Sequence, residues 1–251
     1  MILDTLLNLA LGAVLGVAGG MLGIGGGLIA IPVLGYLYGM DQHLAQGTAL
    51  IMIAPNVMMG FWRYHQRHPV SLRQVALAAV CAMASTYVSA RLAAGIDASA
   101  LHTAFAVFLV VLALYFGRPS KTATQAPAPA APVPPWALPL LGLASGAMSG
   151  IFTVGGGLLV VPALVGFLRM AQTRAQGVAM ALVAPGALVA LLAYAQEGHV
   201  AWNIGLPMAL GGVLTVSWGV HLAHQLPAAR LRMLFCVVLL GTAGAMLVTG
   251  H

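Results

Sequence analysis

The chain has 251 residues, of which 61% are hydrophobic and only 6% are charged, with ten Lys and Arg against four Asp and Glu. A soluble domain carries about 25% charged residues, so this composition excludes a soluble enzyme, a nucleic-acid-binding domain and a disordered protein. The mean hydropathy of +0.99 indicates an integral membrane protein. Cys81 and Cys236 lie inside apolar runs and predict neither a disulfide framework nor a metal site. We expect no cofactor, no metal ion, no catalytic residue and no nucleic-acid partner.

Apolar stretches follow one another along the chain, at residues 5–39, 44–61, 70–92, 99–117, 137–168, 175–195, 200–223 and 230–249. Most have the roughly 20 residues that a helix needs to cross the hydrocarbon core of a bilayer. Stretches 5–39 and 137–168 are too long for one crossing, at about 50 Å each, and a glycine cluster interrupts both of them. We expect each of these two to form a hairpin or a re-entrant pair of helices.

The two halves of the chain repeat each other when the sequence is shifted by 130 residues, without a gap. The matched positions include Gly25/Gly155, Gly26/Gly156, Gly27/Gly157, Pro32/Pro162, Gln46/Gln176, Gly47/Gly177 and Tyr64/Tyr194. Composition alone would not pair both glycine triplets and both Gln-x-x-x-Gln steps, so the pattern indicates a duplication. The expected organisation is an N-terminal repeat at 1–117, a Pro/Ala-rich cytoplasmic linker at 118–136 and a C-terminal repeat at 137–251.

Basic residues predict the orientation of the two repeats. If segment 61–73, which holds three arginines, is cytoplasmic, nine of the ten cations fall in the cytoplasm and Arg91 is the exception. All four acids then fall outside, and the second repeat is inverted relative to the first. The predicted fold class is an all-α polytopic membrane protein with two inverted-topology repeats, each made of a glycine-broken hairpin or re-entrant pair plus three transmembrane helices. Both termini would face the periplasmic or extracellular side of the inner membrane.

Inverted repeats with interrupted helices at matching positions are typical of secondary transporters, whose substrate sites lie at the interruptions. Glycines let the chain turn sharply and let another group approach the backbone. Helices that restart near Leu28 and Leu158 would direct free N–H groups and positive dipole ends at each break, which favours an anion. The alternative is that both glycine triplets are tight hairpin tips with a structural role only.

The predicted substrate-binding residues lie at the breaks and at the start of the following long helix. They are Gly25, Gly26, Gly27, Gln46, Gly47, Thr48, Thr153, Gly155, Gly156, Gly157, Gln176 and Gly177. Gln46 and Gln176 could supply amide donors to a bound oxyanion or hydrogen bonds between helices, and both interpretations stay open. Thr48, Asn56 and Thr153 have no equivalent in the other repeat and could make the site asymmetric.

Two stripes of glycines at every fourth position have a different interpretation. Gly12, Gly16 and Gly20, with the equivalent Gly142, Gly146 and Gly150, predict close packing between helices. No acidic residue lies at mid-membrane, so we do not expect coupling through a buried carboxylate. Coupling to H+ or Na+ and the oligomeric state are open at this stage, and the expected partners are a small anionic substrate and the lipid bilayer.

The segment from Gly20 to Leu34, which reads GMLGIGGGLIAIPVL, resembles the signature of the sulfite exporter TauE/SafE family, also called the toluene-sulfonate uptake permease family. Residues 150–164 give a second copy, and the resemblance extends over about residues 6–249. It implies transport of sulfur-containing anions such as sulfite, thiosulfate or organosulfonates. Carried over by motif, the implied site positions are the two glycine triplets with Gln46, Gly47 and Thr48. The second repeat has Val178 where the first has Thr48, so that half of the site lacks this hydroxyl.

The leading hypothesis is therefore a permease that moves a small sulfur-containing anion by alternating access. An anion channel of the same fold, or a carrier of a small organic carboxylate, is the alternative. A membrane-embedded enzyme would need clustered His, Asp or Glu at membrane depth, which the sequence lacks. A purely structural scaffold would leave the duplicated glycine breaks unexplained.

Overall fold

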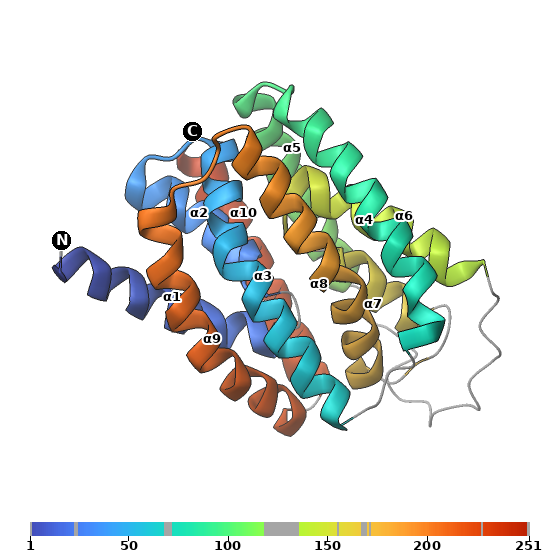
Figure 1. The fold of residues 1–251 in the computed structure, drawn as a ribbon. Coiled ribbons are helices and arrows are strands. Elements are labelled where there is room, and N and C mark those ends of the chain that lie inside the picture. Colours follow the sequence, from blue (N-terminus) through green and yellow to red (C-terminus); the bar gives the residue numbers. More distant parts are fainter. Residues whose placement is uncertain are drawn as a thin grey trace.

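The structure is a computed structural model that describes residues 2–22, 25–67, 72–117, 136–154, 156–166, 170, 172–226 and 228–249, and these form helices and their connections only (Figure 1). The first half holds α1 (Ile2–Leu22), α2 (Gly27–Tyr38), α3 (Gln42–Arg67), α4 (Leu72–Ala94) and α5 (Ala98–Gly117). The second half holds α6 (Ala137–Phe152), α7 (Gly157–Gly166), α8 (Gln172–Gln196), α9 (Trp202–Gln225) and α10 (Ala228–Thr249). Helices α1, α3, α4, α8 and α9 are each long and apolar enough to cross a bilayer. The all-α polytopic fold class is therefore confirmed for the described part of the chain.

Both long apolar stretches are divided in the same way, into a longer helix, a break and a shorter helix. Helix α2 has 12 residues and α7 has 10, lengths of about 18 and 15 Å. Neither can cross a hydrocarbon core of about 30 Å by itself, so each glycine break falls inside the bundle. The predicted linker at 118–136, apart from Trp136, lies outside the described residues.

Helices of the two halves pack in pairs that obey the 130-residue repeat. Helix α1 packs along α9 and the equivalent α6 packs along α4, while α3 contacts α8 and α5 contacts α10. Helices α3 and α8 run antiparallel, because Tyr64 near the end of α3 bonds Gln176 near the start of α8, and Tyr194 near the end of α8 bonds Gln46 near the start of α3 (Figure 1). An inverted repeat needs this antiparallel arrangement of equivalent helices. The orientation of the two halves in a bilayer stays a prediction.

Glycine stripes bring the backbones of the paired helices into contact. A Cβ added to Gly16 would lie 2.5 Å from the backbone oxygen of Gly212, and one added to Gly146 would lie 2.2 Å from the backbone oxygen of Ala82. Gly212 and Ala82 are themselves 130 residues apart, so both contacts follow the repeat. A Cβ added at the other members of the stripes would also lie too close to a backbone oxygen of the paired helix. These members are Gly12, Gly20, Gly142 and Gly150. The predicted packing role of the two stripes is confirmed.

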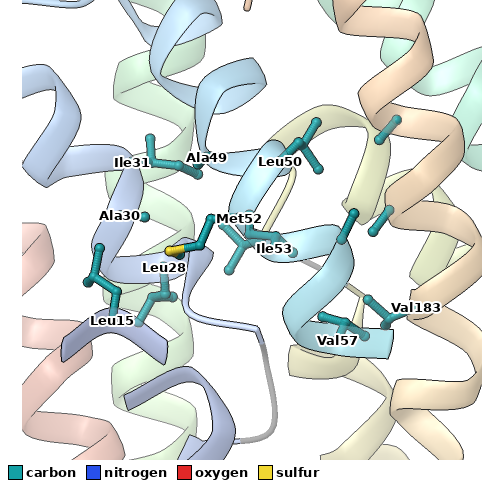
Figure 2. Packing of buried hydrophobic residues seen from close by; sticks show 14 of the residues in the cluster. Leu15, Leu28, Ala30, Ile31, Ala49, Leu50, Met52, Ile53, Val57 and Val183 are labelled. Atoms are coloured by element: carbon teal, nitrogen blue, oxygen red, sulfur yellow. The ribbon is translucent and has the colours of Figure 1, made fainter. Parts of the chain in front are cut away.

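Helices α3 and α8 form the centre of the bundle. Their apolar windows are 72% and 67% buried, well above the 39%, 33% and 44% of α1, α4 and α9. Figure 2 shows Leu28 of α2 close to Met52 of α3, and Val57 of α3 next to Val183 of α8, all in one buried cluster. A helix that is apolar and buried on all sides belongs to the protein interior. The outer helices therefore cover most of α3 and α8, while side chains such as Trp62 of α3 and Leu192 of α8 stay exposed.

Charged residues lie at the ends of helices. Arg91, the one cation predicted to face outward, forms an ion pair with Glu197, an acid predicted to lie on the same side. The hydroxyl of Ser99 and the backbone N–H groups of Ala100 and Ser99 donate to the carboxylate of Asp97 and hold the pKa of that carboxyl below its usual value. Glu197 thus compensates the charge of Arg91, the one cation on the side that is predicted to face outward. Asp97 caps the start of α5.

Replacing Gly146 by Ala should lower the thermal stability of the purified protein in detergent. The added methyl group meets backbone atoms that cannot move aside, and overpacking of this kind costs about 1–3 kcal/mol. Gly241→Ala is the matched control, because a Cβ at Gly241 meets nothing within 4 Å. There the higher helix propensity of Ala should stabilise by up to about 1 kcal/mol. Equal shifts in the melting temperature of the two variants would contradict the backbone contact.

Candidate functional site

The break between α1 and α2 depends on glycine for two separate reasons. Gly25 and Gly26 have φ angles of +72° and +91°, a left-handed region that residues with side chains rarely adopt. A Cβ on Gly26 would also lie 2.7 Å from the backbone oxygen of Leu15. The Gly26 carbonyl accepts hydrogen bonds from the N–H groups of Ile29 and Ala30, which begins α2. The contact of Gly26 with Leu15 shows that the start of α2 lies back against α1, and Gly25 and Gly26 are both buried.

The break between α6 and α7 has the same position but a different chemistry. Thr153 follows α6 with a φ angle of +55°, and it is the only non-glycine residue with positive φ among those described. Its N–H donates to the Ser149 carbonyl at 2.9 Å, and its hydroxyl donates to the Phe152 carbonyl at 2.7 Å. A β-branched residue in this region is strained by about 1–3 kcal/mol. The equivalent residue of the first repeat is Gly23.

The two breaks meet in the interior of the bundle. A Cβ on Gly27, the first residue of α2, would lie 3.6 Å from the backbone oxygen of Thr153. Ile53 of α3 lies against both Gly25 and Gly27. Of the predicted site residues, the structure brings together here Gly25, Gly26, Gly27 and Thr153, all buried. Gly156, which is also buried, lies against Ser145 of α6, and the buried Gly157 begins α7. Gly155 lies outside the described residues. The N-terminal end of α2, with its partial positive charge, therefore lies beside the residue that ends α6 at the second break.

Two crossed hydrogen bonds join the repeats beside the breaks. The hydroxyl of Tyr64 donates to Oε1 of Gln176 at 3.0 Å, and the hydroxyl of Tyr194 donates to Oε1 of Gln46 at 2.7 Å. All four side chains are at most 2% exposed. The hydroxyl of Tyr194 also lies 3.4 Å from the carbonyl of Gly150, so Gln46 of the first repeat reaches the end of α6 in the second. The amide oxygens of both glutamines thus bond helix to helix.

Some buried polar atoms near the breaks have no hydrogen-bond partner among the described residues. They are Nε2 of Gln46, Oδ1 of Asn56 and Oγ of Ser149. Nδ2 of Asn56 donates to the Gly25 carbonyl at 3.5 Å, which places Asn56 at the first break, whereas Gln46 and Ser149 lie at the second. An unpartnered buried polar group costs about 1–3 kcal/mol and in native proteins requires an explanation. A polar solute with donors and acceptors of its own would satisfy all three atoms.

Other predicted site residues lie in different surroundings. A Cβ on Gly47 would lie 1.9 Å from the backbone oxygen of His199, and the hydroxyl of Thr48 accepts a hydrogen bond from the Ala201 N–H at 3.0 Å. Both residues therefore contact the connection between α8 and α9. Gly177 is buried in α8, directly after Gln176.

Sequence reasoning did not assign Ser149, Tyr64 or Tyr194 to the site. The two tyrosines occupy equivalent positions of the repeat, and polar aromatic residues in otherwise apolar helices were a usable signal. Ser149 has no such signal, because Gly19 is its repeat equivalent and small residues are common in packed helices.

The charges of the site come from dipoles rather than from ionised side chains. All four acids of the chain are exposed, so no carboxylate lies at the breaks. The described residues contain no group of three or more His, Cys, Asp and Glu that could hold a metal ion. An anion at the breaks would meet backbone N–H groups and the amide of Gln46.

Comparison with known proteins gives a consistent result over almost the whole chain. The family model described as Sulfite exporter TauE/SafE matches residues 8–246. A "Probable membrane transporter protein" of Xylella fastidiosa (strain Temecula1) is 27% identical over 236 residues, which cover 92% of this chain and 90% of that protein. A protein of the same description from Methanocaldococcus jannaschii is 24% identical over 249 residues, which cover 93% and 91%. No solved structure matches significantly.

The crossed bonds can be measured by a double-mutant cycle on Tyr194→Phe and Gln46→Leu. Each single variant leaves a buried polar group without its partner, so we expect a coupling free energy of about 1–2 kcal/mol in unfolding experiments. The cycle on Tyr64→Phe and Gln176→Leu should give a similar value, because it tests the equivalent bond. Tyr87→Phe, on an exposed side chain, should leave stability unchanged. Absence of coupling in both cycles would contradict the described contacts.

Proposed function

The chain belongs to the sulfite exporter TauE/SafE family, and from this premise we propose that it is a secondary transporter. In this proposal it moves a small sulfur-containing anion such as sulfite, thiosulfate or an organosulfonate across the inner membrane by alternating access. Family membership and the names of the relatives point to a membrane transporter rather than an enzyme. The observation that carries the proposal furthest is the meeting of the two helix breaks, at Gly27 and Thr153, in the interior of the bundle.

The proposed site binds the anion without a charged side chain. The N–H groups at the starts of α2 and α7 would donate to its oxygens, and Nε2 of Gln46 would add a donor that has no other partner among the described residues. Binding without a lysine or arginine keeps the complex weak enough for release, as transport requires. The acceptor Oδ1 of Asn56 suits a solute that also carries a proton or an ammonium group, such as hydrogensulfite or an amino-substituted sulfonate.

Alternating access follows from the matched contacts of the two halves. Because α1 and α9 pack as α6 and α4 do, exchanging the conformations of the halves would give two states of similar energy that open to opposite sides. The described residues of both breaks are buried, which fits an occluded state between these two. The strain at Thr153, which corresponds to Gly23 in the sequence of the first repeat, would favour one state over the other.

Counterflow in liposomes tests the function directly. Liposomes that contain a carrier and are loaded with unlabelled sulfite transiently accumulate labelled sulfite above its outside concentration. Liposomes that contain a channel only bring the inside and outside concentrations of labelled sulfite to the same value. Parallel vesicles loaded with acetate test the carboxylate alternative. Counterflow with sulfite or thiosulfate but not with acetate is the expected result, and simple equilibration of every anion would contradict the proposal.

In the same assay, Gln46→Glu should reduce sulfite counterflow at least about tenfold, because a hydrogen bond to a charged group contributes about 1.5–3 kcal/mol. The substitution keeps an oxygen that accepts from Tyr194 but replaces the donor by an acceptor that repels anions. Gln42→Glu is the matched control, because Gln42 is also buried on α3 and its Nε2 has no partner in the part of the chain that the structure describes. Unchanged transport by Gln46→Glu, or equal losses in both variants, would exclude Gln46 from the site.

A further inference from the structure

A second polar region lies on the surface of the bundle, between the end of α3 and the last turns of α9. It is a pocket of about 330 Å³ lined by Arg63, Gln66, Ser217, Trp218, Val220 and His221. Arg63 lies about 15 Å along α3 from Ile53, the residue that contacts the first break. Arg63 is exposed and bonds Ser217 of α9, whereas the neighbouring Tyr64 is buried and bonds Gln176 of α8. The pocket therefore lies on the surface, on a different face of α3 from the buried contacts of the proposed transport site.

The pocket presents an oriented cation. Nε of Arg63 donates to the hydroxyl of Ser217 at 3.0 Å, which fixes the guanidinium across the groove between the two helices. A guanidinium has five N–H donors, and the bond to Ser217 uses one of them. His221 and Gln66 add further polar groups, and no acidic residue lines the pocket. This donor arrangement matches a phosphate, which arginine binds through two parallel hydrogen bonds.

The residues around the pocket indicate that it lies at the depth of the lipid headgroups. Leu206, Leu210, Leu214 and Trp218 recur at every fourth position of α9 and are 52–74% exposed, so they form one apolar face directed away from the bundle. This face continues from Trp218 to Leu222, which is 40% exposed, and the polar residues His221 and Gln225 lie beside its end. Trp62 of α3, beside Arg63, is 60% exposed as well. Tryptophan is enriched where hydrocarbon gives way to headgroups, so the pocket lies at that boundary.

From these observations we propose that the pocket between α3 and α9 binds the headgroup phosphate of an anionic phospholipid, with its acyl chains along the apolar face of α9. Arg63 binds the phosphate, Ser217 positions Arg63, and Trp218 packs against the glycerol region. Basic pockets between transmembrane helices on the cytoplasmic side are known to bind anionic headgroups, and this end of α3 is predicted to be cytoplasmic. A free inorganic anion has no apolar part that could pack against the apolar face of α9. The proposal does not depend on the transported substrate.

Native mass spectrometry of the purified full-length protein can test this site with dioleoyl phosphatidylglycerol and dioleoyl phosphatidylcholine as probes. We expect phosphatidylglycerol to bind more tightly, and Arg63→Gln to weaken its binding about tenfold, as expected for loss of a charge-assisted contact. Arg174→Gln, on another exposed arginine, is the matched control and should bind like the unmodified protein. Ser217→Ala, which removes only the positioning hydroxyl, should weaken binding a few-fold and gives a second test that does not change charge.

Three results would overturn the proposal. The first is equal binding of the two lipids, and the second is unchanged phosphatidylglycerol binding in both Arg63→Gln and Ser217→Ala. The third is displacement of phosphatidylglycerol by inorganic phosphate at concentrations similar to those of the lipid, which would make the pocket a site for soluble anions. Loss of lipid binding with normal sulfite counterflow would support the lipid site independently of the transport site.

Discussion

Backbone polar groups inside a bilayer must find partners within the protein, and this constraint organises the whole fold. A helix can end at membrane depth only where protein or a water-filled cavity surrounds its free N–H and carbonyl groups. The breaks after Leu22 and Phe152 meet this requirement because α3 and α8 lie beside them in the buried centre. Glycines at every fourth position let α1 and α6 approach α9 and α4 closely enough to enclose both breaks.

The frame is symmetric, but the polar groups that line it are not. The glycine contacts and the two tyrosine–glutamine bonds obey the 130-residue repeat. Asn56, Ser149 and Thr153, by contrast, correspond to glycines in the other repeat. A symmetric frame explains how one protein could reach two conformations related by a twofold rotation, while asymmetric polar groups would let it hold a solute in one orientation. Thr153, with its strained backbone, is one of the asymmetric polar residues and lies at a break that both repeats share.

Much of this arrangement could be predicted from the sequence, because it depends on local rules. Segment lengths, the glycine stripes and the two interruptions follow from hydrophobic patterning and helix geometry, and they were predicted at nearly their observed positions. The contact of Gly47 and Thr48 with the connection after α8 could not be predicted, since it depends on how two distant helices cross. The partners of Tyr64 and Tyr194 depend on the same crossing. The sequence identified both glutamines as candidate hydrogen-bonding residues. Only the fold shows that their amide oxygens accept hydrogen bonds from tyrosines of the other repeat.

The central claim is that the paired breaks form one anion site that opens alternately to the two sides of the membrane. It can be tested most directly with Ser149→Cys in a protein whose Cys81 and Cys236 are replaced by Ala, using a membrane-impermeant thiol reagent in oriented vesicles. If the breaks form one alternately accessible site, the new cysteine is labelled from either side and sulfite protects it from both. Labelling from one side only, or labelling that sulfite leaves unchanged, would contradict it.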